Sequence, residues 1–168
     1  MEKKEYPADK QTLLDVGNYE VYNRDLIRKV FPRIISELKA ERKRTNFGDI
    51  VPFYFTLLTF VDGNKYRKDG MTPNKSYEAA FPSQDTIKAI TDIGTRRQTW
   101  LAEILKQNGL LRKYETRYID RRPYIFYYPS YCPVISEDGY VIDTDTGEKI
   151  IPDIPHILTE LDYLNRWK

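Results

Sequence analysis

Residues 81–128 constrain the fold of this chain more than any other stretch of the sequence. Ser83 precedes an apolar series made by Ile87 and Ile90, so it is predicted to cap a short helix. Gly94 is expected to end that helix, because glycine adopts the positive φ of a sharp turn without steric cost. The stretch therefore begins with a short helix and a tight turn.

A second, longer helix is predicted directly after the turn. Thr95 is expected to cap it, and its apolar residues recur at helical spacing; they are Trp100, Leu101, Ile104 and Leu105. Gly109 stands where helices commonly end, and a strand is expected from Leu110. The residues that come next, RKYETRYIDRRPYIFYY, predict a basic, aromatic β-hairpin.

Three motifs in this stretch resemble the winged helix-turn-helix family: Pro-Ser-x-x-x-Ile, Gly-Thr-Arg-Arg-Gln-Thr and Leu-x-x-x-Gly-Leu-Leu. The resemblance covers residues 46–128. It is closer to the replication initiators of Gram-positive plasmids and phages, and transcription regulators share the same pattern. The resemblance implies that the second helix enters the major groove of double-stranded DNA. Some winged helices bind a protein instead, so a protein-interaction module is the alternative.

The fold class expected for the whole chain is mainly α with a small β component, an α+β fold. At 168 residues the chain is predicted to be one domain with appendages. Residues 1–45 are an N-terminal arm and helical extension, residues 46–132 the winged helix-turn-helix domain, and residues 133–168 an acidic hairpin followed by a C-terminal helix.

Local signals give the expected elements outside the central stretch. Residues 20–44 are helix-prone, and Pro32 either kinks this segment or begins a second helix. Asp49 is expected to cap an apolar helix, VPFYFTLLTF, that supports the other two. Residues 62–80 are expected to form a loop or a weak strand pair. The N-terminal arm is expected to be irregular over residues 1–18.

The C-terminal segment carries two signals of its own. YVIDTDTGEKII alternates apolar and polar residues around Asp145-Thr146-Gly147, which predicts a hairpin. An amphipathic helix is predicted beyond it from Ile157, Leu158, Leu161 and Leu164. Such an apolar stripe has to be covered, either by its own domain or by a second copy of the chain.

Charge is distributed unevenly along the chain. Eight acidic and three basic residues give residues 133–168 a net charge of −5, and the total of +2 therefore leaves +7 on residues 1–132. The basic charge coincides with the predicted helix-turn-helix, as expected of a surface that binds nucleic acid. The basic residues within 20–44 are either a solvated helix face or a second DNA contact.

The second predicted helix supplies the candidate base contacts. Its exposed face is expected to carry Thr95, Thr99, Ala102, Glu103 and Lys106, with Arg96 at the edge. Arg can pair with guanine, Gln with adenine, and Thr can touch a thymine methyl group. Glu103 either selects cytosine or repels phosphate. Arg97 lies nearer the buried side, where it either forms a salt bridge within the domain or reaches phosphate.

Thirteen residues are the candidate DNA contacts. They come from the ends of the two helices and from the hairpin, whose basic residues are expected to bind phosphate. The full set is Ser83, Gln84, Thr95, Arg96, Arg97, Gln98, Thr99, Lys106, Arg112, Lys113, Arg117, Arg121 and Arg122. Arg96, Gln98 and Thr99 are expected to carry sequence preference, and Arg112, Lys113, Arg121 and Arg122 to carry affinity.

Catalysis, cofactors and metals are not expected. One cysteine, Cys132, and one histidine, His156, cannot supply a thiolate or imidazole cluster. There is no Gly-rich phosphate loop, and DTDTGE lacks the full calcium-loop pattern. The beginning of the chain has no secretory h-region and no apolar run reaches membrane-spanning length, which predicts a cytoplasmic protein with no membrane partner.

Partners are predicted by the same reasoning. Double-stranded DNA is the expected ligand, and a replication protein is a further expected partner of an initiator. A homodimer through residues 24–44 or 156–167 is expected to place two reading helices on an inverted repeat, about one helical turn apart.

Overall fold

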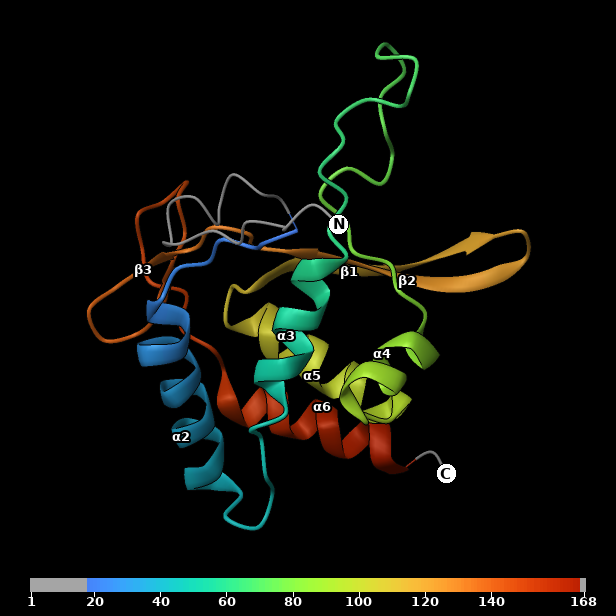
Figure 1. The fold of residues 1–168 in the computed structure, drawn as a ribbon. Helices are drawn as coiled ribbons and strands as arrows, with labels where there is room; N and C mark the ends of the chain where they lie inside the picture. The colour runs from blue at the N-terminus through green and yellow to red at the C-terminus, as the bar shows by residue number, and fades with distance from the viewer. Residues whose placement is uncertain (1–17, 167–168) are drawn as a thin grey trace, which may run out of the picture.

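The computed structural model describes the backbone of residues 18–166 and the side chains as far as Tyr163, and its elements form an α+β fold (Figure 1). The arm predicted over residues 1–18 lies outside the described residues, apart from its last residue. The side chain of Leu164, which contributes to the predicted apolar stripe, also lies outside them. The predicted fold class is confirmed at the level of α+β.

The N-terminal extension is helical over a shorter range than predicted. One turn of π-helix, η1 (Leu26–Val30), leads without a break into α2 (Phe31–Glu41). Pro32 lies in the first turn of α2, directly after the π-helical turn, so it marks the junction between the two helical stretches. Of the two predicted roles of this proline, the start of a helix is the one observed.

Helix α3 (Ile50–Thr59) is the central support of the core, and Phe53, Tyr54 and Leu57 are fully buried in it. Asp49 precedes this helix as predicted, but its side chain does not cap it. That carboxylate instead accepts hydrogen bonds from Arg97. The predicted cap is therefore wrong in its chemistry, although the position of the helix start is correct.

Helices α4 (Gln84–Thr91) and α5 (Thr95–Gln107) come next, in the predicted order. Ser83 caps α4, since its Oγ accepts a hydrogen bond from the N–H of Thr86 at 3.0 Å. The turn between the helices differs from the prediction. Asp92 supplies the positive φ, at 59°, whereas Gly94 has a φ of −66° and stands at the N-cap of α5. Thr95 is therefore the first helical residue and not the cap.

Strands β1 (Leu111–Ile119) and β2 (Arg122–Pro129) form one antiparallel ribbon, called here the long hairpin. Its turn has two residues, Asp120 and Arg121, with φ values of 48° and 64°. This left-handed pair matches the twist of the flanking strands. One residue between α3 and α4 joins the sheet, because Ala80 exchanges backbone hydrogen bonds of 2.7 and 2.8 Å with Tyr127.

The insertion between α3 and Ala80 projects from the body of the molecule (Figure 1). Isolated bridges join Val61 to Ala80 and Tyr66 to Pro73. Of the two predicted alternatives, the weak strand pair is therefore the one observed.

The acidic segment folds differently from its prediction. Two short strands, β3 (Val134–Ile135) and β4 (Val141–Ile142), pair around a turn that contains Gly139. The predicted hairpin around Asp145-Thr146-Gly147 is present but short. It has one bridge, Ile142 to Lys149, and backbone hydrogen bonds of 2.8 Å from Asp143 to Glu148 and from Ile150 to Val141. Sequence alternation found the second turn but missed the first, because the β3 strand has only two residues.

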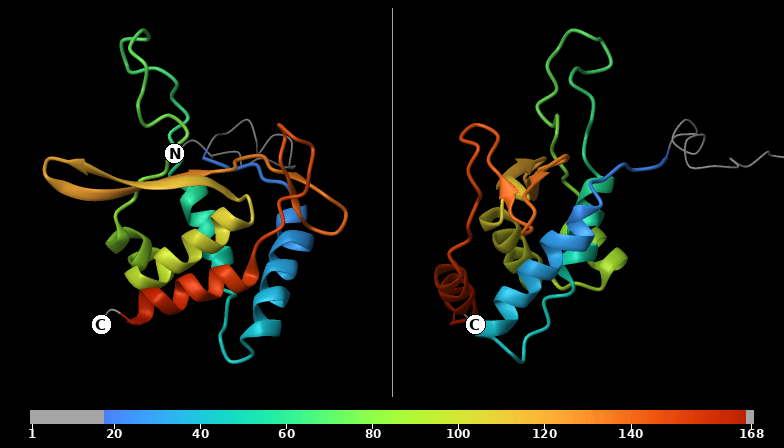
Figure 2. Two further views of the ribbon diagram at one scale, coloured as in Figure 1. Left: turned by 180° about the vertical axis from the view of Figure 1, so that it is seen from behind. Right: turned by 90° about the vertical axis from the view of Figure 1, so that its left-hand side faces the viewer.

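Helix α6 (Ile154–Arg166) packs against α5, and the other views show it crossing the lower part of the molecule (Figure 2). Ile157 and Leu161 are fully buried in the same hydrophobic core as Leu26 and Val30. The N-terminal extension, the central domain and the C-terminal segment therefore share one hydrophobic core. The apolar stripe of α6 is covered by its own chain, as far as its side chains are described.

Candidate nucleic-acid interface

Packing around α5 leaves less of it exposed than periodicity predicts. The hairpin and α6 pack against it in addition to α3 and α4. Ala102 belongs to the buried core at 1% exposure, so the prediction that it allows close approach to a groove is wrong. Among the residues expected on the exposed face, Thr95 and Lys106 are exposed, whereas Thr99 and Glu103 are half-buried.

Gln98 is fully buried, which overturns its predicted role as an adenine contact. Its Nε2 donates to the backbone carbonyls of Gln84 and Ile93, each at 2.9 Å. These two acceptors lie at the start of α4 and in the turn before α5. Gln98 therefore holds the helix-turn-helix together from inside and does not face solvent.

Of the two roles predicted for Arg97, the one observed is a salt bridge within the domain. Its Nε lies 2.8 Å from Oδ2 of Asp49 and its Nη2 3.0 Å from Oδ1, a two-point ion pair. Nη2 also donates to the carbonyl of Asn46, and the guanidinium lies 5.5 Å from the centre of the Trp100 ring. The side chain is thus engaged in joining α5 to the start of α3.

Glu103 joins α5 to the long hairpin. Its carboxylate accepts hydrogen bonds from the Tyr114 hydroxyl at 2.8 Å and from Gln107 at 3.0 Å. Partial burial raises the pKa of Glu103, but these hydrogen bonds and nearby Lys106 outweigh that effect and hold the pKa below its ordinary value. Lys106 lies over the Tyr114 ring, 5.6 Å from its centre. Glu103 and Lys106 are therefore both engaged in contacts between α5 and the long hairpin.

The first turn of α5 retains polar groups that are available to a ligand. Thr95 and Arg96 are exposed, and the Arg96 side chain has no hydrogen bond or ion pair with the described part of the chain. Within the described residues, the side chain of Thr99, one turn further along, makes a single hydrogen bond, from Oγ1 to the Thr95 carbonyl at 3.4 Å.

Basic residues along β1, below the tip of the long hairpin, are largely paired with acids. Arg112 lies 2.7 Å from Glu78, and Arg117 binds Glu115 as well as the Tyr128 hydroxyl. Lys113 lies 3.8 Å from Glu115 and over the Tyr128 ring. The register places Lys113, Glu115 and Arg117 on the same face of the ribbon. Glu78 and Glu115 therefore partly neutralise the charges of Arg112, Lys113 and Arg117.

The hairpin tip (residues 118–122) differs from the base. Arg121 lies in the turn and Arg122 begins the returning strand, the positions predicted for both. Both are exposed, and within the described residues neither forms an ion pair. The register also confirms that Tyr118 and Ile119 lie on opposite faces of the ribbon.

A cavity of about 350 Å³ separates the first turn of α5 from the long hairpin. The starts of α4 and α5 line one side, with Ser83, Gln84, Asp85 and Thr95, and the hairpin lines the other, with Thr116, Pro123, Tyr124 and Ile125. Ser83 and Gln84, both predicted DNA contacts, are thus brought beside Thr95 at this cavity. Sequence reasoning missed Thr116 and Tyr124, although strand alternation places Thr116 on the same face as Tyr114.

We give the name basic contact surface to five candidates that remain uncommitted or only weakly engaged: Thr95, Arg96, Thr99, Arg121 and Arg122. They lie at the start of α5 and at the hairpin tip. The remaining basic candidates hold the fold together or are paired with acids. Lys88 on α4 is a further exposed lysine without an ion pair in the described chain, and no sequence signal distinguished it from an ordinary solvated lysine.

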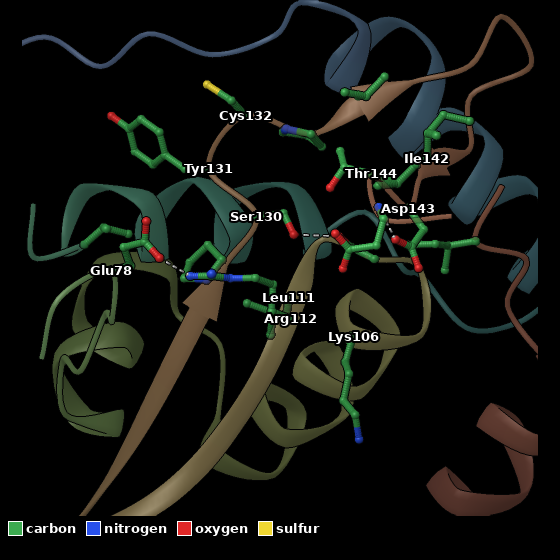
Figure 3. Close-up of a pocket in the computed structure, with 18 of the residues that line it drawn as sticks. Glu78, Lys106, Leu111, Arg112, Ser130, Tyr131, Cys132, Ile142, Asp143 and Thr144 are labelled. Carbon is green, nitrogen blue, oxygen red and sulfur yellow. Dashed lines mark hydrogen bonds and ion pairs between the residues drawn. The ribbon is translucent and has the colours of Figure 1, made fainter. Parts of the chain in front are cut away.

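A larger cavity of about 870 Å³ lies at the base of the long hairpin, beside the acidic segment (Figure 3). Five acids and two bases line it: Glu20, Asp62, Glu78, Asp143, Asp145, Lys106 and Arg112. The Glu78–Arg112 ion pair crosses part of its wall. An excess of carboxylates disfavours a polyanion, so this cavity is separate from the basic contact surface.

Two further properties describe the chain between residues 18 and 166. No group of three or more His, Cys, Asp or Glu residues among them is arranged to hold a metal ion. None of the described helices has the length and apolar character needed to cross a membrane.

No family model matches the chain, and neither a curated protein nor a solved structure matches it.

Proposed function

We propose that this chain is a non-catalytic, sequence-preferring protein that binds double-stranded DNA through the basic contact surface. In this proposal the domain is a winged helix-turn-helix, with α3, α4 and α5 as its helices and the long hairpin as its wing. The first turn of α5 enters the major groove, and the hairpin tip contacts the adjacent backbone or minor groove.

One observation carries the proposal. Within α5 and the long hairpin, the arginines without an acidic partner in the described chain are Arg96, Arg121 and Arg122, at the two places where such a fold meets DNA. Unpaired arginines also occur in other described segments, at Arg24, Arg28, Arg44 and Arg67. Arginines in the same elements that point elsewhere, such as Arg97 and Arg117, are tied to carboxylates. This separation supports a surface that keeps its cations free for phosphate and base edges.

The biological role that we propose is initiation of plasmid or phage replication, or assistance to it, in the cytoplasm. The resemblance over residues 46–128 supports this role. A transcriptional repressor with the same fold is the second candidate. The two roles differ in the fate of the bound DNA, because an initiator site has to open or bend whereas a repressor site needs only to be occupied.

Selection of bound sequences from random duplexes, together with a salt titration on the selected site, tests the proposal. We expect one enriched motif, and an affinity that falls with salt by about 0.9 in log–log slope for each phosphate contacted. Absence of enrichment, together with affinity that does not change with salt, would refute it.

The alternative function, docking onto a protein, is favoured by a different observation. Ile90 on α4 is 56% exposed, and docking onto a protein partner would cover this apolar side chain. If this function is correct, Ile90→Ser abolishes partner binding and leaves DNA binding unaffected. Among the described apolar residues of the two segments predicted to form a homodimer, Leu26, Val30, Ile34, Leu38, Ile157 and Leu161 are buried within one chain, which leaves less apolar surface there for a second copy. Sedimentation with and without duplex tests for such a dimer.

A further inference from the structure

The tip of the long hairpin presents apolar surface that the described chain does not cover. Tyr118 is 74% exposed and Ile119 is 41% exposed. Apolar residues that are exposed singly are normal on soluble proteins. Here two of them are adjacent in sequence at a protruding turn, on opposite faces of a narrow ribbon. Arg121 and Arg122 follow them within four residues, so positively charged side chains flank the apolar surface.

The hairpin is anchored firmly at its base. Tyr127 is fully buried, and the Phe126 ring stacks on Phe81 with 4.7 Å between their centres. On the face opposite Phe126, which Tyr127 shares, the hydroxyl of Tyr114 donates a hydrogen bond to Glu103 of α5. A ribbon fixed at these points carries its tip in a defined direction relative to α5.

The tip projects to one side of the first turn of α5. That turn faces the outer half of the hairpin, because Thr95 shares a cavity with Thr116 and Pro123. Only the last few residues of the ribbon extend beyond it, at about 3.4 Å per residue, and Figure 1 shows the outer part of the hairpin extending past the helices. The tip is therefore placed to approach the DNA backbone and the groove next to the one that α5 would occupy.

We propose that the hairpin tip is a minor-groove wedge. Tyr118 or Ile119 inserts between two base pairs of the bound duplex, and Arg121 and Arg122 bind the flanking phosphates. The minor groove is only about 6 Å wide, so side chains at the tip can enter it but the ribbon itself cannot. Apolar side chains that insert in this way unstack a base step and bend the duplex.

This inference rests on the proposed DNA binding and adds deformation of the DNA to it. It favours initiation of replication over simple repression, because an unstacked step is a starting point for strand opening. The tip would then have two separable roles, with the arginines supplying affinity and the apolar pair supplying distortion.

Binding and distortion can be measured separately, on the full chain and a selected duplex. Fluorescence anisotropy reports binding. End-to-end energy transfer reports the bend, and 2-aminopurine placed at successive positions reports unstacking. We expect a bend of about 20–90° and a local rise in 2-aminopurine fluorescence at saturation.

Variants assign the distortion to the tip. Tyr118→Ser combined with Ile119→Ser should remove the bend and the fluorescence rise, while affinity changes by less than about tenfold. Tyr118→Phe keeps the apolar ring and should retain the distortion. Tyr66→Ser, at an exposed tyrosine of the insertion, is the matched control and should change neither signal. Circular dichroism establishes that each variant is folded.

The outcomes separate the wedge from the proposed function. Tight, salt-dependent binding to a straight and fully stacked duplex would overturn the wedge and leave DNA binding intact. The wedge is equally overturned if the double serine variant bends DNA as the original chain does. No binding to any duplex would overturn both, and retention of an acidic protein by the tip would then identify the other class of ligand.

Discussion

The guanidinium of Arg97 and the carboxylate of Asp49 form a two-point ion pair, with Nε 2.8 Å from Oδ2 and Nη2 3.0 Å from Oδ1. This contact joins the first turn of α5 to the start of α3. Arg96, the preceding residue, has no such partner in the described chain. Two adjacent arginines of one helical turn therefore have different tasks, one within the fold and one facing solvent.

Arg97→Ala is expected to destabilise the protein, and Arg96→Ala to weaken DNA binding. Loss of the partly exposed ion pair should lower the free energy of unfolding by about 1–2 kcal/mol. Arg96→Ala should leave stability within about 0.5 kcal/mol but cost roughly 1–3 kcal/mol of binding on the preferred site. Urea unfolding and anisotropy measure the two effects, and identical behaviour of both variants would contradict this division.

Gln98→Leu is expected to destabilise the helix-turn-helix. The substitution keeps a similar volume but leaves the carbonyls of Gln84 and Ile93 without their side-chain donor, at a cost of about 1–2 kcal/mol. Gln84→Ala is the control, because only the backbone of Gln84 takes part in this contact. Urea unfolding compares the two. Equal stability of Gln98→Leu and the original chain would show that the buried amide is not needed.

Arginines at the hairpin tip are expected to account for part of the salt dependence of DNA binding. Arg121→Ala combined with Arg122→Ala should reduce the log–log slope by about 1.8, or 0.9 for each phosphate that is no longer neutralised. The control is the double variant Arg112→Gln with Glu78→Gln. It removes an existing ion pair without changing the net charge, so it should leave the slope nearly unchanged. A control slope that fell as far as the tip slope would show that phosphate binding is spread along the hairpin.

Acidification is expected to loosen the contact between α5 and the long hairpin. The pKa of Glu103 is lowered in the folded chain, so its stabilising effect is complete above the unfolded pKa and is lost as pH falls through the folded value. Glu103→Gln should therefore lose less stability than the original chain between neutral pH and pH values below about 4. Urea midpoints across this range measure the difference, and parallel curves would contradict it.

Arg33→Met is expected to be the most destabilising of these substitutions. Arg33 donates to the Gly139 carbonyl at 2.9 Å and to Asn108 at 3.0 Å, and it pairs with Glu37 at 2.8 Å. Its side chain is only 9% exposed, so its loss leaves poorly hydrated acceptors and should cost about 3 kcal/mol. Lys39→Met, on the exposed face of the same helix, is the matched control for thermal unfolding.

Local chemistry predicted much of the fold. The Ser83 cap depends on neighbours within three residues, and the alternation of Tyr118 and Ile119 depends only on strand geometry, so both could be predicted from the sequence. Helical periodicity likewise located α5 and α6. These features share one property, because each is determined within a single element.

The candidate site was harder to predict because it depends on which elements meet. Periodicity placed Ala102 on the exposed face of α5, but it cannot reveal that the hairpin and α6 also pack on that helix. Gln98 is a suitable type to read a base and an equally suitable type to hold a buried turn. The pairing of Arg97 with Asp49 joins residues 48 positions apart, beyond any local pattern.

The packing of α6 has a consequence for how the molecule is made. Leu26 and Leu161 belong to one core, so the earliest and latest of its buried side chains have to meet before that core is complete. During synthesis, which proceeds at about 5–20 residues per second, α5 emerges well before α6 and presents an unfilled apolar flank to the cell for several seconds. Chaperone engagement should therefore peak on nascent chains that stop between α5 and α6, and decline once Leu161 is free to dock.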